Sequence, residues 1–390
     1  MTKKSDAPAI RFKGFSDAWE QRKVQGVADR FDNLRIPVAA NLRVHGTTPY
    51  YGANGIQDYV EGFTHDGEFV LVAEDGANDL KNYPVKCVNG RIWVNNHAHV
   101  LQGKAGIADN SFLAFAISQS DIESLLVGGG RAKLNAETLM SIEFRLPCLQ
   151  EQYRIGEYLT QLNHLITLHQ RKFEKLTNVK KSMLEKMFPQ NGSSYPEIRF
   201  KGFTDPWEQR KFGEITSKYE DPVPTPHDGY YRLGIRSHAK GTFHSYVAKG
   251  QELETAQMHR VAAGNFIVNI TFGWEHAVAI TDKNDAGKLV SHRFPQFSFA
   301  EGMVPEFFRY VIVDEKFRHH LWLASPGGAG RNRVLKLDEM LNYLMRFPSR
   351  DEQIKIAEFF RHLDNLITLH QRELEKLQNI KKSMLEKMFV

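Results

Sequence analysis

Residues 151–188 read EQYRIGEYLTQLNHLITLHQRKFEKLTNVKKSMLEKMF, and residues 352–389 repeat them 201 positions later as EQIKIAEFFRHLDNLITLHQRELEKLQNIKKSMLEKMF. In both copies apolar residues recur at alternating steps of three and four, which is the spacing of a heptad seam on one face of a helix. A continuous helix of this length would extend about 57 Å at about 1.5 Å per residue, far beyond an average globular helix. The repeat therefore predicts two long helices.

The seam holds one His and one Lys at matching positions of both copies, which weakens it as a purely apolar zipper. An ordinary pair of core helices is the alternative, but it accounts poorly for the length of the repeat. The simplest partner for each helix is the other copy, packed antiparallel as a coiled coil. The seam positions are Leu159, Leu162, Ile166, His169, Phe173, Leu176, Lys180, Met183 and Met187, then Phe360, Leu363, Ile367, His370, Leu374, Leu377, Lys381, Met384 and Met388.

A second block recurs ahead of two unlike segments. Residues 10–24 read IRFKGFSDAWEQRKV, and residues 198–212 read IRFKGFTDPWEQRKF, 188 positions later. The two segments enclosed by the repeated blocks barely resemble each other. Because 201 exceeds 188 by 13, the second segment is 13 residues longer. We call the repeated blocks the frame and the enclosed segments the interiors, and we expect four segments at 1–148, 149–190, 191–349 and 350–390.

Both interiors predict mixed α/β globules. Runs rich in β-branched and aromatic residues, bounded by Gly, Asn and Asp, predict strands. Helical patterns start near Ser111, a candidate N-cap, and near Pro305, which suits a first helical turn. The predicted strands lie within EFVLVAED (68–75), GRIWVNNHAHVL (90–101), MSIEFRLP (140–147), NFIVNITF (265–272), HAVAIT (276–281) and LNYLMRFP (341–348).

The composition is that of a soluble protein of more than one domain, with 390 residues, 42% hydrophobic and 25% charged. Cys87 and Cys148 are the only cysteines, too few for a disulfide framework or a structural zinc site. No apolar run reaches the roughly 18 residues that span a bilayer. The first residues lack the apolar core of a secretory signal, so a cytoplasmic location is expected. The net charge of +5 is compatible with nucleic acid but does not establish it.

Two unlike globules held by two near-identical helices form an internal repeat with a twofold character. If the helices pack antiparallel, the globules are expected at opposite ends, related by a pseudo-twofold axis. Duplex DNA offers successive half-sites about 34 Å apart for each helical turn. A constant frame with variable interiors therefore suits a reader of two different half-sites.

The frame carries a specific resemblance. The alternation of IRFKGF-x-D-x-W-E-Q-R-K, a variable interior, a P-x-x-x-E-Q or P-x-x-D-E-Q junction and LITLHQR-x-x-EKL-x-N-x-KKSMLEKMF, present twice, resembles the specificity subunit of Type I restriction-modification systems. The resemblance covers essentially the whole chain. It implies that each interior is a target-recognition domain for one half of a split DNA site and that the helices fix the unread spacer.

The same resemblance implies partners and a division of chemistry. The helices would dock adenine-N6 methyltransferase subunits and, through them, the translocating restriction subunit. S-adenosylmethionine, ATP and magnesium would belong to those partners, leaving this chain without a cofactor and without catalysis. The residues agree, because the sequence holds no N-P-P-Y or D-P-P-Y tetrapeptide, no G-x-x-x-x-G-K-[ST] loop and no H-E-x-x-H. The rival interpretations are a stand-alone DNA-binding regulator, an independent nuclease or methyltransferase, and a scaffold that binds only protein.

Candidate DNA contacts are loops that combine Arg, Lys, Asn or Gln with glycine, because such side chains read base edges and free backbone N–H groups hold phosphates. Each has a structural alternative: a packed N-G turn, a polar strand end or a solvated loop. Trp19 and Trp207 lie in the frame and are assigned to packing, since a shared frame cannot encode two half-sites. The candidates are Tyr50, Tyr51, Asn54, Gln57, Asn95, Asn96, His97, Arg131 and Lys133, then Arg232, Arg236, His238, Lys240, Arg331, Asn332 and Arg333.

Overall fold

The computed structural model describes residues 8–389 except 129–131, 254, 256 and 328–332. It divides into two compact units, each described here by itself. Unit 1 comprises Met1–Lys172 with His370–Val390, and unit 2 comprises Phe173–Leu369. The units do not follow the four expected segments, because each long helix contributes residues to both.

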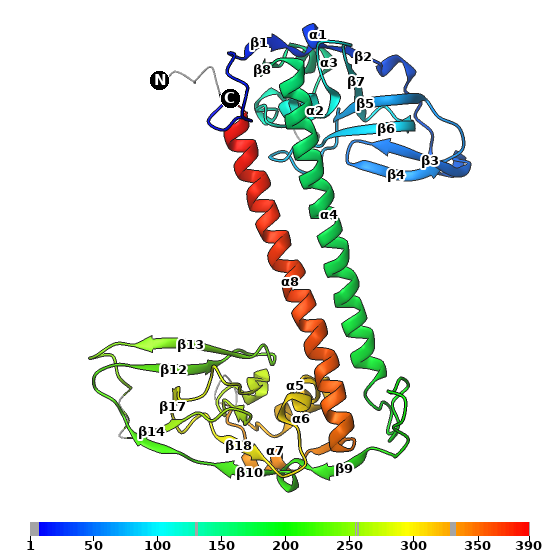
Figure 1. Ribbon diagram of the computed structural model, residues 1–390. Coiled ribbons are helices and arrows are strands. Elements are labelled where there is room, and N and C mark those ends of the chain that lie inside the picture. Colours follow the sequence, from blue (N-terminus) through cyan, green and yellow to red (C-terminus); the bar gives the residue numbers. More distant parts are fainter. Residues whose placement is uncertain (1–7, 129–131, 254, 256, 328–332, 390) are drawn as a thin grey trace. The chain divides into compact units, whose positions relative to one another are not determined.

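The two long helices are α4, Leu149–Lys186, and α8, Arg350–Met388, and both are continuous as predicted. In unit 1 the first part of α4 lies beside the last part of α8, so the two segments run antiparallel (Figure 1). In unit 2 Leu176 and Met183 of α4 pack with Ile356 and Phe360 of α8, again antiparallel. The predicted heptad seam is therefore confirmed as the packing face within each unit.

The frame of unit 1 ties distant parts of the chain together. Strand β1, Glu20–Lys23, pairs antiparallel with β8, Glu143–Leu146. Arg11 donates two hydrogen bonds to the fully buried Glu151 of α4, at 2.8 and 2.7 Å, and Trp19 Nε1 donates a third at 3.2 Å. Phe389 stacks on Phe112 with ring centres 5.5 Å apart and meets Trp19 edge to face. The two frame blocks thus close on each other through ionic and aromatic contacts.

Unit 2 repeats these contacts with the matching residues. Strand β9, Glu208–Lys211, pairs with β19, Leu344–Phe347. Arg199 donates two hydrogen bonds to Glu352 at 2.8 and 2.7 Å. Phe188 stacks on Phe307 and meets Trp207 edge to face, with ring centres 5.7 Å apart in both pairs. The packing role expected for the two frame tryptophans is therefore observed in both units.

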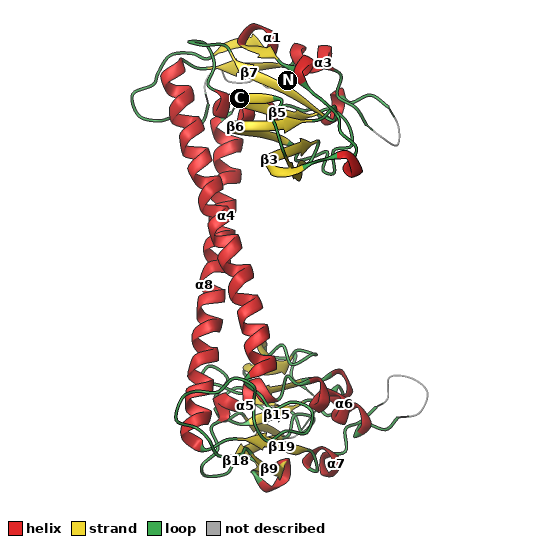
Figure 2. Ribbon diagram, turned by 90° about the vertical axis from the view of Figure 1, so that its right-hand side faces the viewer, coloured by secondary structure: helices red, strands yellow, loops and turns green. Residues whose placement is uncertain are grey.

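The interior of unit 1 is one six-stranded sheet in the order β2-β7-β5-β6-β3-β4 (Figure 2). Along β5, Val70 and Val72 face the helical core, whereas Phe69 and Leu71 belong to a second core on the other face, as the period of two requires. The elements are α1 Val24–Val27, β2 Ala28–Arg30, β3 His45–Gly52, β4 Gly55–Val60, β5 His65–Ala73, β6 Val85–Val94, β7 Ala98–Gly103, α2 Asn110–Ser118 and α3 Ala136–Ser141.

The interior of unit 2 has a different sheet topology. One sheet has the order β10-β18-β15-β16 and the other β11-β14-β17-β12-β13. The elements are β10 Thr216–Tyr219, β11 Pro222–Pro224, β12 Tyr230–Ile235, β13 Thr242–Val247, β14 Gln257–Arg260, β15 Phe266–Val268, β16 Val278–Ile280, β17 Leu289–Val290, β18 Gln296–Phe299, α5 Pro305–Val311, α6 Glu315–Leu323 and α7 Leu337–Leu341. The predicted mixed α/β class is confirmed, and the same frame encloses one sheet in unit 1 and two sheets in unit 2.

Three local predictions need correction. The N-cap of α2 is Asp109, whose carboxylate accepts a hydrogen bond from the Phe112 N–H at 2.7 Å, so the assignment of Ser111 was wrong. The run at 90–101 forms the end of β6, a turn and β7 rather than one strand. The run at 265–272 is a strand only as β15, because the Asn269 carboxamide accepts hydrogen bonds from Thr271 and bends the chain.

Candidate nucleic-acid interface

Most candidate residues of unit 1 gather at one edge of its sheet. The β3–β4 turn, the β6–β7 turn and the end of β5 meet there, because Asn95 N–H donates to Tyr51 O at 3.1 Å and Glu74 N–H to His97 O at 2.9 Å. Lys133 reaches the same edge through a β-bridge to Asp75. The structure therefore brings segments separated by up to 80 residues into one rim.

Hydrogen bonds hold several of these side chains in place. The side-chain amide of Asn95 donates from Nδ2 to Gln57 Oε1 at 3.4 Å, and its side-chain oxygen Oδ1 accepts from the backbone N–H of His97 at 2.8 Å. Asn54 is exposed in its turn, yet its carboxamide bonds Gly76 O and Asn78 N–H, both at 2.9 Å. Gln57 and Asn96 are exposed at the same rim. The rim thus presents carboxamides with fixed orientation.

Tyr50 and Tyr51 have different surroundings from the exposed candidates. Tyr50 is 1% exposed, its hydroxyl accepts from Val38 N–H at 2.9 Å, and the Arg43 guanidinium lies 4.1 Å from its ring centre. Tyr51 is 6% exposed, and burial raises the pKa of its hydroxyl. In this structure both rings pack within the globule, which is the alternative that the sequence left open for them.

A buried charge network lies beneath the rim and was missed by the sequence analysis. Arg35 lies 2.6 Å from Glu74 and 3.5 Å from Asp32, and Lys133 lies 2.8 Å from Glu74. Burial raises the pKa of Asp32, but the hydrogen bonds from His99 and from Val100 N–H and the charge of Arg35 together outweigh it, so the pKa lies below its ordinary value. Glu74 behaves likewise through Lys133 and Arg35. Asp32 and Arg35 are neighbours in sequence, but Glu74, His99 and Lys133 lie 39 or more residues away from them, so no local motif indicated the network.

Unit 2 presents a cleft of 630 Å³ rather than a rim of turns. Arg232 of β12 lines it together with His292 and Arg293, which were not among the candidates from the sequence. Phe243 and Phe272 supply aromatic walls and are 40% and 46% exposed. Cationic and aromatic groups in one cleft suit phosphate contacts and base contacts respectively.

The hairpin after β12 carries three further candidates. Arg236 donates to Thr242 O, and its guanidinium lies 5.3 Å from the Phe243 ring centre. His238 has a φ of 61°, and its backbone N–H donates to Glu275 O at 2.9 Å. The side chains of His238 and Lys240 are exposed. This loop therefore adds positive charge beyond the cleft.

The glycine loops are only partly visible. Arg131, Arg331 and Asn332 lie outside the described residues. Arg333 is described, and its guanidinium lies 4.7 Å from the ring centre of Trp322, which is 44% exposed. The sequence expectation for these loops stays a prediction.

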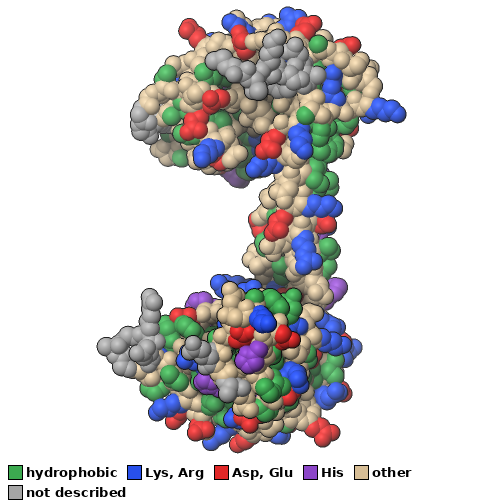
Figure 3. Space-filling model, turned by 90° about the vertical axis from the view of Figure 1, so that its left-hand side faces the viewer, with side chains coloured by type: hydrophobic (Ala, Val, Ile, Leu, Met, Phe, Trp, Pro, Cys, Tyr) green, Lys and Arg blue, Asp and Glu red, His purple; other side chains and the backbone are tan. Residues whose placement is uncertain are grey.

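The face drawn in Figure 3 shows Lys and Arg interspersed with Asp and Glu on each unit, in keeping with a net charge of +5. Within the described residues, no helix is long and apolar enough to cross a membrane. The same residues contain no group of three or more His, Cys, Asp or Glu arranged to hold a metal ion. Hydrogen-bonding and cationic groups are what the two candidate surfaces offer.

Three comparisons relate the chain to known proteins. Residues 16–178 match the family model described as the Type I restriction modification DNA specificity domain. A putative type I restriction enzyme specificity subunit of Haemophilus influenzae is 44% identical over 146 residues, which are 37% of this chain and 38% of that protein. The MjaVIII specificity subunit of Methanocaldococcus jannaschii is 23% identical over 304 residues, 73% of this chain and 70% of that protein. The chain thus spans well under half the length of the first relative.

The fold comparison covers more of the chain. The crystal structure of the Type-I restriction-modification S subunit from M. genitalium aligns over 98% of this chain and 99% of that one, with a TM-score of 0.65 and 12% identity. At this identity the likeness concerns the fold. The resemblance read from the repeated motifs is confirmed by the domain model and the relatives. Residues 16–178 thus match the DNA specificity domain of Type I restriction-modification systems, and the chain is similar to specificity subunits of these systems.

Proposed function

We propose that this chain is the non-catalytic subunit that directs a methyltransferase and endonuclease complex to a DNA site in two halves, with one half read by each unit. The observation that supports this most is the repeated frame: the same ionic and aromatic contacts enclose two interiors of different sheet topology. A frame that stays constant while its contents differ is what reading two unlike half-sites requires. Fold alone does not give this function.

We assign base reading to the exposed candidates. In unit 1 these are Asn54, Gln57, Asn96 and the partly exposed Lys133, and in unit 2 they are Arg236, His238, Lys240 and the partly exposed Arg232. Asn and Gln can pair bidentately with adenine, and Arg with guanine, in the major groove. The buried Tyr50 and Asn95 would act by holding the rim in shape.

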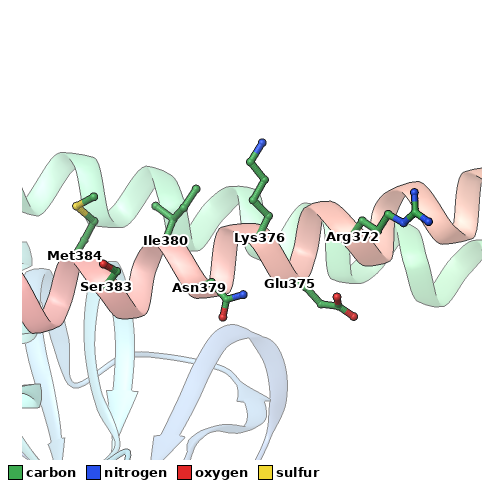
Figure 4. Close-up of a pocket in the computed structure, with 7 residues that line it drawn as sticks. All are labelled: Arg372, Glu375, Lys376, Asn379, Ile380, Ser383 and Met384. Carbon is green, nitrogen blue, oxygen red and sulfur yellow. The ribbon is translucent and has the colours of Figure 1, made fainter. Parts of the chain in front are cut away.

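Partner docking is assigned to the long helices. A shallow hollow of 530 Å³ lies on α8 and is lined by Arg372, Glu375, Lys376, Asn379, Ile380, Ser383 and Met384. Lys376, Ile380 and Met384 leave the helix on one side, whereas Glu375 and Asn379 leave it on the other (Figure 4). Mixed apolar and charged groups of this kind suit a protein partner. The adenine-N6 methyltransferase would dock here, the restriction subunit through it, and S-adenosylmethionine, ATP and magnesium would belong to these partners.

Co-expression tests the proposal. The chain is expressed with the adenine methyltransferase encoded beside it, and N6-methyladenine is mapped across the host genome. We expect a motif of two short defined halves around a fixed gap, present only when this chain is present. Methylation that is independent of the chain would contradict the proposal. Tight sequence-specific binding by the purified chain without any complex would favour the stand-alone regulator instead.

A further inference from the structure

The same lysine of the repeat has opposite surroundings in the two units. In unit 2, Lys180 Nζ lies 2.5 Å from Asp364 Oδ1, and the Tyr310 hydroxyl donates a hydrogen bond to Asp364 Oδ2 at 3.0 Å. The Lys180 ammonium also lies 5.9 Å from the Tyr310 ring centre. The charge of Lys180 is therefore balanced inside the chain by a carboxylate that a third residue holds in position.

In unit 1 the matching residues cannot make this cluster. Lys381 stands 201 positions after Lys180, and Asn163 stands 201 positions before Asp364, so a neutral carboxamide replaces the carboxylate. Phe112 matches Phe307, because each stacks on the terminal phenylalanine of the repeat. Three residues later, Phe115 therefore takes the place of Tyr310 and lacks its hydroxyl. Both groups that balance the ammonium in unit 2 are missing.

The ammonium of Lys381 consequently lacks the counter-ion that Lys180 has, and its side chain is partly shielded from solvent. Its side chain is partly buried, and burial lowers its pKa. Within the described residues, no hydrogen bond or ion pair to Lys381 is found. A partly desolvated ammonium without a counter-ion is unfavourable, so an anion that binds beside it gains both Coulomb attraction and hydrogen bonds.

Lys381 and Asn163 both line a cleft of 1270 Å³ between β6, α2, α4 and α8 of unit 1. The lining contributes five Lys or Arg side chains and three carboxylates, a formal excess of two positive charges. One of the carboxylates, Glu68, accepts a hydrogen bond from Asn110 at 3.3 Å. Thr160 and Asn163 add side-chain hydrogen-bonding groups to the lining. Three other polar side chains of the lining already donate within the chain: Ser118 to Phe115 O, Thr167 to Asn163 O and Asn82 to Asp79 Oδ2.

We propose that this cleft binds a small oxyanion of the phosphate class, with Lys381 as its counter-ion and Asn163 as a neutral neighbour that leaves room for it. A long polyanion suits the cleft less well, because Asp121 and Glu386 also line it and would repel a phosphate chain. None of the candidate DNA-contacting residues lines this cleft. The proposal is therefore independent of the DNA-reading role.

The test is calorimetric titration of the full-length chain with inorganic phosphate at constant ionic strength. We expect saturable binding to one site in the wild type. Asn163→Asp rebuilds the carboxylate of unit 2 next to Lys381 and should weaken phosphate binding at least tenfold, as should Lys381→Met. The matched control is Lys180→Met, which removes the balanced lysine of unit 2 and should leave phosphate affinity unchanged.

Each result decides the question. Equal phosphate affinity in the wild type and Asn163→Asp would overturn the proposal, as would the absence of saturable binding in the wild type. If phosphate does not bind but Lys381→Met lowers affinity for duplex DNA, the site is part of the DNA surface and the small-anion proposal fails. Asn163→Asp adds an internal ion pair, so its melting temperature should not fall, which separates lost binding from lost folding.

Discussion

Replacing Glu151 in the frame of unit 1 should lower the free energy of unfolding more than replacing the matching Glu352 in unit 2. Glu151→Met leaves the Arg11 guanidinium, whose side chain is 13% exposed, without its buried carboxylate. Removing one partner of a buried ion pair costs about 3 to 5 kcal/mol. Glu352→Met does the same to Arg199, whose side chain is 14% exposed. The ionic part of the two losses should therefore be nearly equal.

The difference comes from the tryptophan. Trp19 Nε1 donates to Glu151 at 3.2 Å, whereas the buried Trp207 Nε1 has no hydrogen-bond partner among the described residues. Glu151→Met thus leaves one more buried donor unsatisfied, which costs about 1 to 3 kcal/mol. The full loss in unit 1 should reach about 4 to 8 kcal/mol as the sum of both costs.

Native-state hydrogen exchange measures both losses within one chain. We expect the free energy of opening to fall in peptides from residues 149–162 for Glu151→Met, and in peptides from residues 350–363 for Glu352→Met, by the smaller amount. The double variant Arg11→Met/Glu151→Met should recover much of the loss, because an apolar pair replaces the unpaired charge. A double variant that is as unstable as Glu151→Met would show that the ion pair is not what holds the frame.

Four further outcomes are expected. Inserting one or two helical turns between Thr160 and Thr177 should lengthen the unread gap of the methylated motif without changing either half. Altered halves with an unchanged gap would contradict the idea that the helices fix the length of the gap. Replacing residues 24–147 with another interior should change one half of the motif, and a change in both would refute independent reading. Asp109→Ala should lower the free energy of unfolding by about 1 kcal/mol through loss of the α2 N-cap, measured by urea unfolding, and a change near zero would count against that cap. The folded pKa of Asp32 is lowered, so its contribution to stability is present above its unfolded pKa of about 3.9 and is lost as pH falls through the folded value; Asp32→Asn should flatten the acid side of the stability profile, and an unchanged slope would exclude this.

The frame could be predicted from sequence because the chain repeats it. Apolar spacing fixed the seam face of α4 and α8, and the repeat itself identified the partner. The ionic contact of Arg11 with Glu151 could not be predicted from a local sequence pattern, because 140 residues separate the two. The repeat could have suggested it, because both residues recur as Arg199 and Glu352.

The interiors were less predictable for a physical reason. Strand existence follows local β-propensity, but strand order and the course of turns depend on contacts between distant segments. The run at 90–101 turns at Asn95 because its side chain caps the bend, so the one predicted strand is two strands that lie on either side of β5. Identical residues also acquired different roles, since Lys180 is paired and Lys381 is not. Such differences arise from neighbours rather than from the residues themselves.

Unit 1 contains residues 370–389, so its aromatic slot beside Trp19 and Phe112 stays open during synthesis until Phe389 has emerged. At about 5 to 20 residues per second, the delay after Lys172 amounts to roughly 10 to 40 s. Meanwhile the nascent chain already displays KKSMLEKMF at the end of α4, identical to the segment that will later fill the slot. An incompletely synthesised chain therefore exposes both the aromatic slot and a segment that could fill it. Neighbouring ribosomes on one messenger RNA bring such chains close to one another. The nascent chain must therefore be protected from contacts with other nascent chains during this interval. The completed protein, in which the slot is filled, gives no sign of this requirement.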